Sequence, residues 1–316
     1  MKNPVIFAEQ IIKGKVLTYH LRHDGGSYYE HNMKSFNGKS ILDIQATNKR
    51  IKEMIEKSEP FMVCRFGAVE LSTVKTFDFE LQSKYEGQLK RVHTSAGVFP
   101  ETSEIGKRFT ELMIQSISEA DLIGIWPQPF EEYYLGKYGS ETLQYTWLKY
   151  LEPWRNINAP WTAGLAGKKV LVIRPFSESI IRQYKRYKDI YPGTTILPEF
   201  SLDVMKSVQT SGGGEDERFQ DWFQAYEWMK KEIRKRDFDI AILGCGAYGF
   251  PLAAEIKRMG KQAIHFGGST QILFGIIGAR WDNDEVVQKL KNDAWVRPLE
   301  SERPSHAENV ENACYW

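Results

Sequence analysis

The sequence predicts an α/β protein with a Rossmann-like layered, mainly parallel sheet and helices on both faces. Three observations support this fold class. Short apolar runs alternate with amphipathic helical segments in the C-terminal half, the loops between them are short, and two of the apolar runs end in glycines. Strands that alternate with helices pair in parallel through right-handed crossovers. A chain of 316 residues is long enough to bury the core of such a fold.

The N-terminal part of the chain is less regular. Residues 1–45 are weakly periodic, with a loop-like stretch at 22–40, and we expect an N-terminal extension packed on a main domain of residues 46–316. Isoleucines from Ile41 to Ile55 are spaced by three, seven and four residues, which are helical intervals and predict a helix leading to Pro60. The apolar run that follows, at 61–64, predicts a buried strand.

The middle of the chain is expected to contain helices, a second strand and an irregular segment. Residues 83–118 have helical periodicity, broken near 97–100, and a strand is predicted at 121–126, where two prolines follow. The aromatic- and proline-rich segment 130–165 is expected to contain a helix at 141–151. This segment could form a lid, a wall that binds the acceptor, or an irregular region with only a structural role.

The C-terminal half alternates regularly between strand and helix patterns. We expect strands at 168–173, 194–198, 239–243 and 262–266, and helices at 177–187, 216–236 and 251–260. A glycine-rich loop at 211–217 is expected to join two helices.

Composition excludes several classes of protein. The 42 basic and 41 acidic side chains nearly balance, so the basic excess typical of a general nucleic-acid binder is missing. The three cysteines are far apart and form no CxxC pair, which argues against a zinc site or a disulfide framework. No apolar run approaches 18 residues, so we expect a cytoplasmic protein without a transmembrane segment, whose membrane association could only be peripheral or through a partner.

A glycine pattern follows the strand at 239–243. Gly244-x-Gly246-x-x-Gly249 is the spacing of dinucleotide-binding turns, in which the pyrophosphate binds at a helix N-terminus. A nicotinamide site also needs an acidic residue at the tip of the next strand, and here that tip reads His265-Phe266-Gly267-Gly268. We therefore expect no NAD, and two readings stay open: a phosphate-facing turn, or glycines that only permit a tight corner.

A second glycine turn favours the binding interpretation. The strand at 262–266 also ends in glycines, and small polar residues follow it. The carboxyl ends of parallel strands are where open α/β sheets bind ligands. The expected ligand-binding residues of the two turns are Gly244, Gly246, Tyr248, Gly249, Gly267, Gly268, Thr270 and Gln271.

Another polar group follows the strand at 61–64. Arg65 could clamp a phosphate or carboxylate through two hydrogen bonds, and Glu70 could bind a metal or act as a base. An alternative is a local ion pair between the two residues at the start of a helix.

These residues carry a resemblance to a family. "RFGAVEL" resembles the R-[FY]-G-D-G-E signature of GT-D type (DUF1792-like) bacterial glycosyltransferases. Four blocks of the second half, "LVIRPFSESIIRQY", "ILGCGAYGFPLAAEIK", "IHFGGSTQILFGIIGARW" and "RPLESERPSHAENVENACYW", look like proteins of polysaccharide gene clusters grouped with that fold. The resemblance covers residues 50–316.

The resemblance implies a Rossmann-like domain, a UDP-sugar donor, and an acidic D-x-E motif that assists a divalent metal, usually manganese. Arg65, Gly67 and Glu70 match positions of the signature, but Ala68 stands where the signature has its aspartate. A pair of carboxylates binds a hard cation such as manganese or magnesium better than one carboxylate does. Glu70 is thus the expected metal ligand, either with acids from elsewhere or in a branch that works without a metal.

We therefore expect a glycosyltransferase that acts with a nucleotide-sugar donor and a glycan acceptor in capsule, lipopolysaccharide or glycoprotein assembly. Glu70 is the preferred catalytic carboxylate, Asp203 is a weaker alternative, and Arg280 could help to stabilise the leaving diphosphate. His265 could bind phosphate, act as a base, or be a structural histidine. Two rival hypotheses are a catalytically inactive nucleotide-binding subunit of a polysaccharide assembly system and a nicotinamide-dependent sugar oxidoreductase or epimerase.

Overall fold

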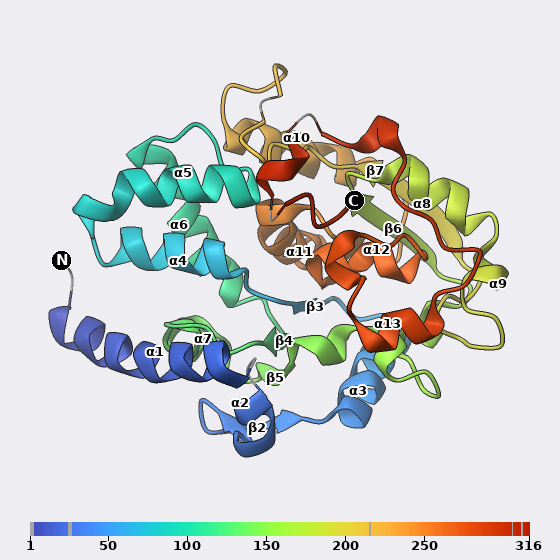
Figure 1. The fold of residues 1–316 in the computed structure, drawn as a ribbon, viewed down its shortest axis with the longest axis horizontal. Helices are drawn as coiled ribbons and strands as arrows, with labels where there is room; N and C mark the ends of the chain where they lie inside the picture. Colours follow the sequence, from blue (N-terminus) through green and yellow to red (C-terminus); the bar gives the residue numbers. More distant parts are fainter. Residues whose placement is uncertain (1–2, 25–26, 215, 305, 311) are drawn as a thin grey trace.

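A sheet of nine strands runs through the molecule, and helices cover both of its faces (Figure 1). The computed structural model describes residues 3–24, 27–214, 216–304, 306–310 and 312–316. In chain order its strands are β1 (Ser35–Phe36), β2 (Lys39–Leu42), β3 (Phe61–Cys64), β4 (Leu122–Ile125), β5 (Gln144–Trp147), β6 (Lys169–Arg174), β7 (Ser201–Lys206), β8 (Ile240–Leu243) and β9 (Gln262–His265). Their order across the sheet is β1-β2-β5-β4-β3-β9-β8-β6-β7.

The sheet is mainly parallel, as the sequence predicts. β1 is antiparallel to β2, and the pairings among the other strands are parallel. The α-helices are α1 (Pro4–Asp24), α2 (Ser27–Asn32), α3 (Ile44–Lys57), α4 (Ala68–Asp78), α5 (Tyr85–Ala96), α6 (Ser103–Ile117), α7 (Glu131–Tyr138), α8 (Ser177–Tyr184), α9 (Tyr187–Ile190), α10 (Trp222–Arg234), α11 (Gly249–Arg258), α12 (Thr270–Leu273) and α13 (Glu285–Leu290).

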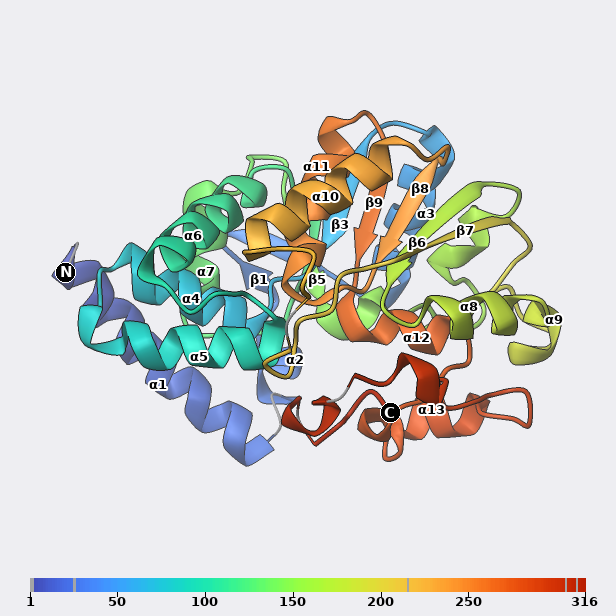
Figure 2. The same cartoon turned by 90° about the horizontal axis from the view of Figure 1, so that it is seen from above.

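Alternating side chains of the central strands build two separate cores. Met62 and Ala241 face one core, whereas their neighbours Val63 and Ile242 face the other. Successive side chains of a strand point to opposite faces, so a strand that is covered on both sides reads as a continuous apolar run. Helices α4, α6, α7, α10 and α11 contribute to the first core, and α3, α8, α12 and α13 contribute to the second. Figure 2 shows α10 and α11 lying over the strands β8 and β9.

Several predicted elements are wrong. The helix expected at 141–151 is instead the strand β5, followed by a 3-10 turn at Leu148–Leu151, because Tyr145 and Trp147 are buried in a parallel pairing with β4. The strand expected at 194–198 is irregular, and the edge strand β7 lies at Ser201–Lys206. Most of its side chains are half-buried or exposed, so β7 lacks the continuous apolar run that marks a central strand. The glycine-rich loop therefore joins β7 to α10, not two helices.

The N-terminal segment is more regular than expected. Residues 4–24 form α1, and the stretch expected as loop contains α2 and β1. β2 pairs in parallel with β5 and thereby extends the main sheet. None of the described helices is both long enough and apolar enough to cross a membrane.

Close packing between α4 and α6 can be tested with two helical glycines. A Cβ at Gly106 of α6 would lie 2.3 Å from the buried ring of Phe77 on α4, whereas a Cβ at Gly87 of α5 would meet nothing within 4 Å. We expect Gly106→Ala to lower the free energy of unfolding by roughly 1–3 kcal/mol through overpacking. Gly87→Ala should raise it by up to about 1 kcal/mol because alanine favours the helix. Urea unfolding measures the free energy of unfolding of both variants, and equal changes in the two would contradict this packing.

Candidate functional site

The candidate site lies at the carboxyl ends of four neighbouring strands, β3, β9, β8 and β6. The chain leaves β3 into α4 and β9 into α12, and the apolar side chains of these two helices belong to opposite faces of the sheet. Neighbouring strands whose connections depart to opposite faces leave a crevice between them, and open α/β sheets bind ligands there. In Figure 2 the C-terminal segment lies across this end of the sheet, close to α12.

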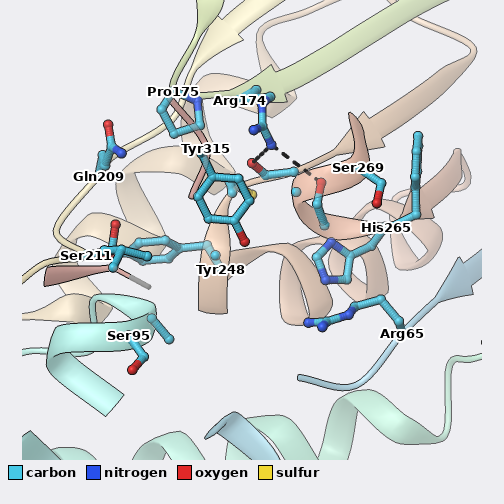
Figure 3. A pocket seen from close by; sticks show the side chains of 18 of the residues that line it. Arg65, Ser95, Arg174, Pro175, Gln209, Ser211, Tyr248, His265, Ser269 and Tyr315 are labelled. Carbon is cyan, nitrogen blue, oxygen red and sulfur yellow. Dashed lines mark hydrogen bonds between the residues drawn. The ribbon is translucent and has the colours of Figure 1, made fainter. Parts of the chain in front are cut away.

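A cavity of about 370 Å³ occupies the crevice (Figure 3). This volume lies within the range of roughly 300–1,000 Å³ that is usual for small-molecule sites. Many of the residues predicted from the sequence line it: Arg65, Glu70, Gly244, Gly246, Tyr248, His265, Gly267, Gly268 and Arg280. Gly67, Asp203, Gly249, Thr270 and Gln271 are not part of the lining.

The first glycine turn is required by close packing and by backbone conformation. A Cβ at Gly244 would lie 2.6 Å from the carbonyl oxygen of Gly267 and 2.7 Å from the Arg174 guanidinium, so a side chain there would separate the two turns. Gly246 has a φ of +58°, a left-handed conformation that glycine adopts without strain. It begins the 3-10 turn Gly246–Tyr248 that leads into α11, and the first N–H groups of such a turn have no partner within it.

The third glycine of the pattern packs against His265. A Cβ at Gly249 would lie 2.3 Å from the His265 ring, so Gly249 makes room for the imidazole below the pocket. His265 is 3% exposed, and its Nδ1 lies 3.2 Å from the carbonyl oxygen of Leu243. A carbonyl only accepts, so Nδ1 carries the hydrogen and Nε2 is the acceptor in the neutral ring.

The surroundings of His265 make it a weak base. Burial, with the positive charge of Arg65 nearby, lowers the pKa of His265 to about 3. The ring is therefore neutral at pH 7, and it could accept a hydrogen bond but binds a proton poorly. This argues against its role as a general base, for which a pKa near the working pH is most effective.

Arg65 extends from the end of β3 along the pocket wall. Its guanidinium lies 5.4 Å from the ring centre of Trp126, and among the described residues no carboxylate forms an ion pair with it. The buried carboxyl of Glu131 lies close enough to feel the Arg65 charge, but burial raises the pKa of Glu131 to about 8. Glu131 is thus mainly uncharged at pH 7 and does not neutralise Arg65. The local ion pair between Arg65 and Glu70 that the sequence allowed is not formed.

Glu70 stands in the first turn of α4 and folds back toward the start of the helix. A Cβ at Gly67 would lie 2.0 Å from its carboxylate, so the glycine of the signature makes room for this acid. Glu70 is 9% exposed and lines the pocket beside Ala68, and none of the described side chains donates a hydrogen bond to it. The pocket thus contains a carboxylate that is not committed to an ion pair.

Arg174, the last residue of β6, lines the pocket but was missed by sequence reasoning. It is 3% exposed, and its Nη1 donates to the carbonyl oxygen of Gly244 at 3.1 Å and lies 3.5 Å from that of Gly267. Its Nη2 donates to Oε1 of Gln271, and its buried Nε has no partner among the described residues. The available signal was an arginine at the tip of an apolar strand, directly before Pro175.

Arg174 keeps its positive charge in this buried position. Burial lowers the pKa of Arg174 to about 10, which still leaves the guanidinium protonated at pH 7. No carboxylate among the described residues forms an ion pair with it. Glu302 is a carboxylate whose charge acts on Arg174, but it accepts hydrogen bonds from the backbone of Glu178 and from Ser179. Arg174 is therefore a buried cation without a bound counter-charge.

Several residues expected to bind ligand also pack against the C-terminal segment. Gln271 is fully buried and donates through Nε2 to the carbonyl oxygen of Tyr315 at 3.2 Å. A Cβ at Gly268 would lie 2.3 Å from the Tyr315 ring, and Nη1 of Arg280 donates to the Tyr315 hydroxyl at 3.2 Å. Thr270 is buried beneath the turn, where its hydroxyl donates to the Gly267 carbonyl at 2.8 Å. Tyr315 is thus a wall of the pocket (Figure 3).

Asp203 lies outside the pocket. It is part of the edge strand β7, and both of its carboxylate oxygens accept hydrogen bonds from Nη1 of Arg236, at 2.6 and 2.7 Å. The structure does not bring it together with Glu70 or His265. Its position at the far side of β6 argues against the catalytic role considered for it.

The segment 130–165 contributes little to the pocket. Leu148 and Glu152 are its lining residues, whereas Trp154 and Trp161 are fully buried in the core. Glu152 accepts hydrogen bonds from Arg155 at 2.5 Å and from Ser269 at 2.7 Å. The segment is mainly structural, with one edge against the site.

The acidic groups of the pocket do not fit a metal held by the protein. Among the described residues, no group of three or more His, Cys, Asp or Glu side chains could hold a metal ion. Glu70 and Glu152 are the carboxylates of the lining, and Glu152 is bound to Arg155 and Ser269. Ala68 has no oxygen to offer at the place of the signature aspartate. A hard divalent cation favours several oxygen ligands, which this set does not provide.

Protonation of His265 should make the protein sensitive to acid. Its pKa is about 3 in the folded chain and near 6.5 when exposed, so the unfolded state binds more protons between these values. Its contribution to stability is complete above pH 6.5 and is lost as the pH falls toward 3. In urea unfolding from pH 7 to pH 4, His265→Gln should lose less stability than the wild type. The exposed His306→Gln should parallel the wild type, and parallel curves for all three proteins would contradict a neutral His265.

Comparisons with known proteins find distant similarity to two solved structures. No protein-family model matches the sequence, and no curated protein matches it. A solved structure of domain of unknown function 1792, described as having "a distinct glycosyltransferase fold", shares 13% identity with a TM-score of 0.44, over 85% of this chain and 94% of that chain. A selenomethionine-substituted structure of the same domain shares 14% identity with a TM-score of 0.43, over the same fractions. Similarity at this level does not identify an activity.

Proposed function

We propose that the protein is a cytoplasmic glycosyltransferase that transfers a sugar from a nucleotide-sugar, with a UDP-sugar as the first candidate, to a growing glycan. Surface polysaccharide or glycoprotein biosynthesis is the proposed setting. The observation that carries the proposal is a pocket at the carboxyl ends of parallel strands in which neither Arg65 nor Arg174 forms an ion pair with a carboxylate of the described residues. A nucleotide-sugar would bring the anionic diphosphate that such a pair of cations favours.

The remaining parts of the pocket agree with such a ligand. A Cβ at Gly246 or at Gly267, one in each glycine turn, would meet no atom closer than 3.4 Å, so a ligand could approach the backbone there, at the ends of β8 and β9. Trp126, Phe176 and Tyr315 line the same cavity and offer aromatic faces on which a base or sugar could stack. The matching positions of the glycosyltransferase signature, Arg65 and Glu70, both lie on this wall.

The chemistry requires a group that accepts a proton. In glycosyl transfer the bond between the anomeric carbon and the diphosphate oxygen breaks, and the electron pair leaves with the diphosphate. The acceptor oxygen forms the new bond to the anomeric carbon and gives up its proton. We assign proton acceptance to Glu70, because His265 is a weak base and Glu152 is already bound to Arg155.

A second candidate function is a nucleotide-binding subunit without transferase activity. Ala68 at the place of the signature aspartate, next to a single uncommitted carboxylate, favours this alternative. Thermal-shift measurements with UDP, GDP, CMP and NAD, each with and without manganese, address the ligand. Stabilisation by NAD alone would contradict a nucleotide-sugar site, whereas stabilisation by UDP without turnover of any UDP-sugar would favour the inactive subunit.

Removing the charge of Glu70 should slow transfer without disturbing the helix. Glutamine also suits the first turn of a helix, so Glu70→Gln keeps the shape and the helix start but cannot accept the proton. We expect kcat for transfer or donor hydrolysis to fall by roughly 10²–10⁴-fold, with nucleotide affinity nearly unchanged.

The matched control for this variant is Glu104→Gln. Glu104 also stands in the first turn of a helix, α6, but its side chain is 80% exposed and faces solvent. Its substitution should leave kcat at the wild-type value. An unchanged kcat in Glu70→Gln would remove Glu70 from the chemistry.

A further inference from the structure

We propose that Arg174 and Arg65 together form a cradle for the diphosphate of the donor and take the place of a divalent metal, so that the reaction proceeds without one. The identity of the donor rests on the proposed function. The cradle itself rests on the placement of two cations and two glycine turns at four adjacent strand ends.

The unpaired charge of Arg174 indicates an anionic ligand. A buried charge without a partner is strongly unfavourable, and buried arginines are normally matched by a carboxylate. Here the guanidinium is 3% exposed. Within the described chain it donates hydrogen bonds only to neutral oxygens, and its Nε has no partner. The described part of the chain therefore holds a positive charge at the pocket wall with no carboxylate in an ion pair with it.

Arg174 is also held rigidly. The carbonyl oxygens of Gly244 and Gly267 and the amide of Gln271 fix one side of the guanidinium. The ring centre of Phe176 lies 4.7 Å from it and that of Tyr315 lies 5.8 Å from it. A charge fixed before the reaction stabilises a developing negative charge without a cost of reorganisation. Arg174 is thus suited to the leaving diphosphate.

Arg65 approaches the same turn from the other side. The strand order β3-β9-β8-β6 separates Arg65 from Arg174 by two strands, each of which ends in a glycine turn. A Cβ at Gly267 would lie 3.8 Å from Cδ of Arg65, while Nη1 of Arg174 lies 3.5 Å from the Gly267 carbonyl oxygen. The side chains of Arg65 and Arg174 therefore both lie near Gly267, where a diphosphate could contact them and the backbone together.

The acids of the pocket support the replacement of the metal. Two positive charges lie at the turn, and Glu70 is the one lining carboxylate of the described chain that is not bound to an arginine. In the proposed step the bond from the anomeric carbon to the diphosphate oxygen breaks, and Arg174 and Arg65 stabilise the charge that builds on that oxygen. The acceptor oxygen binds the anomeric carbon, and its proton passes to Glu70. The products are the nucleoside diphosphate and the extended glycan.

Calorimetric titration with pyrophosphate, UDP and uridine, in EDTA and in manganese, tests the cradle on the full chain. For the wild type, pyrophosphate and UDP should bind in EDTA with a Kd within about twofold of that in manganese. Arg174→Gln and Arg65→Gln should each weaken pyrophosphate and UDP by at least about tenfold, because a charge-assisted contact is lost. Uridine, which carries no phosphate, should bind these variants as it binds the wild type.

Two further variants keep this test decisive. Arg182→Gln removes an exposed arginine of α8 that pairs with Glu178, and it should bind as the wild type does. Arg174→Lys keeps the positive charge but loses the planar guanidinium. It should bind pyrophosphate with an affinity between those of the wild type and Arg174→Gln, and it takes the place of Arg174→Gln in the test if that variant does not fold. Thermal unfolding of each variant reports its folded state before titration.

The outcomes separate the cradle from the proposed function. Binding of UDP only with manganese, or wild-type pyrophosphate affinity in the Arg174 and Arg65 variants, overturns the cradle and leaves the transferase proposal standing. Metal-free pyrophosphate binding that requires both arginines, without binding of any nucleoside diphosphate, supports the cradle and contradicts the nucleotide-sugar donor. Absence of pyrophosphate and UDP binding under either condition overturns the cradle.

Discussion

The guanidinium of Arg174 lies against the carbonyl oxygens of Gly244 and Gly267, in space that a Cβ at Gly244 would occupy. This contact joins the ends of three strands, β6, β8 and β9, and determines how closely the two glycine turns approach. The pocket floor, the position of Gln271 and, through Gln271, the position of Tyr315 all depend on it. One buried cation thus organises residues from widely separated parts of the chain.

The electrostatics of the site divide the polar groups into different roles. Burial holds His265 neutral and raises the pKa of Glu131, so neither contributes a full charge at pH 7. Arg65 and Arg174 remain charged, and Glu70 provides an acid that no described cation neutralises. A site with this balance favours a ligand with more than one negative charge.

The sequence predicts the central part of this fold because buried parallel strands carry their own signal. β3, β4 and β8 are continuous apolar runs, whereas β6 and β9 are apolar between polar end residues. The predicted bounds of all five strands agree with the structure within a residue or two. β5 and β7 could not be placed in the same way. β5 is rich in aromatic residues that suit a helix or a strand, and β7 is an edge strand whose pattern mixes polar and apolar side chains. Tertiary pairing decides both elements.

The site residues also divide into those that the sequence indicates and those that depend on tertiary packing. The sequence indicates the two glycine turns, Arg65 and Glu70, because they follow apolar runs directly. It does not show that Gly249 accommodates an imidazole, that Gln271 holds the C-terminal segment, or that Asp203 is bound by Arg236 at an edge. Arg174 stands at the tip of an apolar run, directly before Pro175, but this position alone does not show that its charge lacks a partner. Its importance arises from a lack of counter-charge, and that depends on every residue packed around it.

Tyr315 and Trp316 share the pocket wall with Arg65 and Glu70, although these pairs come from opposite ends of the sequence. The pocket also takes residues from both halves of the sheet, on either side of the boundary between β3 and β9. A ligand in this pocket therefore binds a surface that exists only when the whole sheet is assembled. A ligand that binds only the folded chain shifts the equilibrium away from unfolding. Its binding free energy therefore stabilises the whole native state and not one part of the sheet. Occupancy of the pocket and cooperative unfolding of the chain are thermodynamically linked.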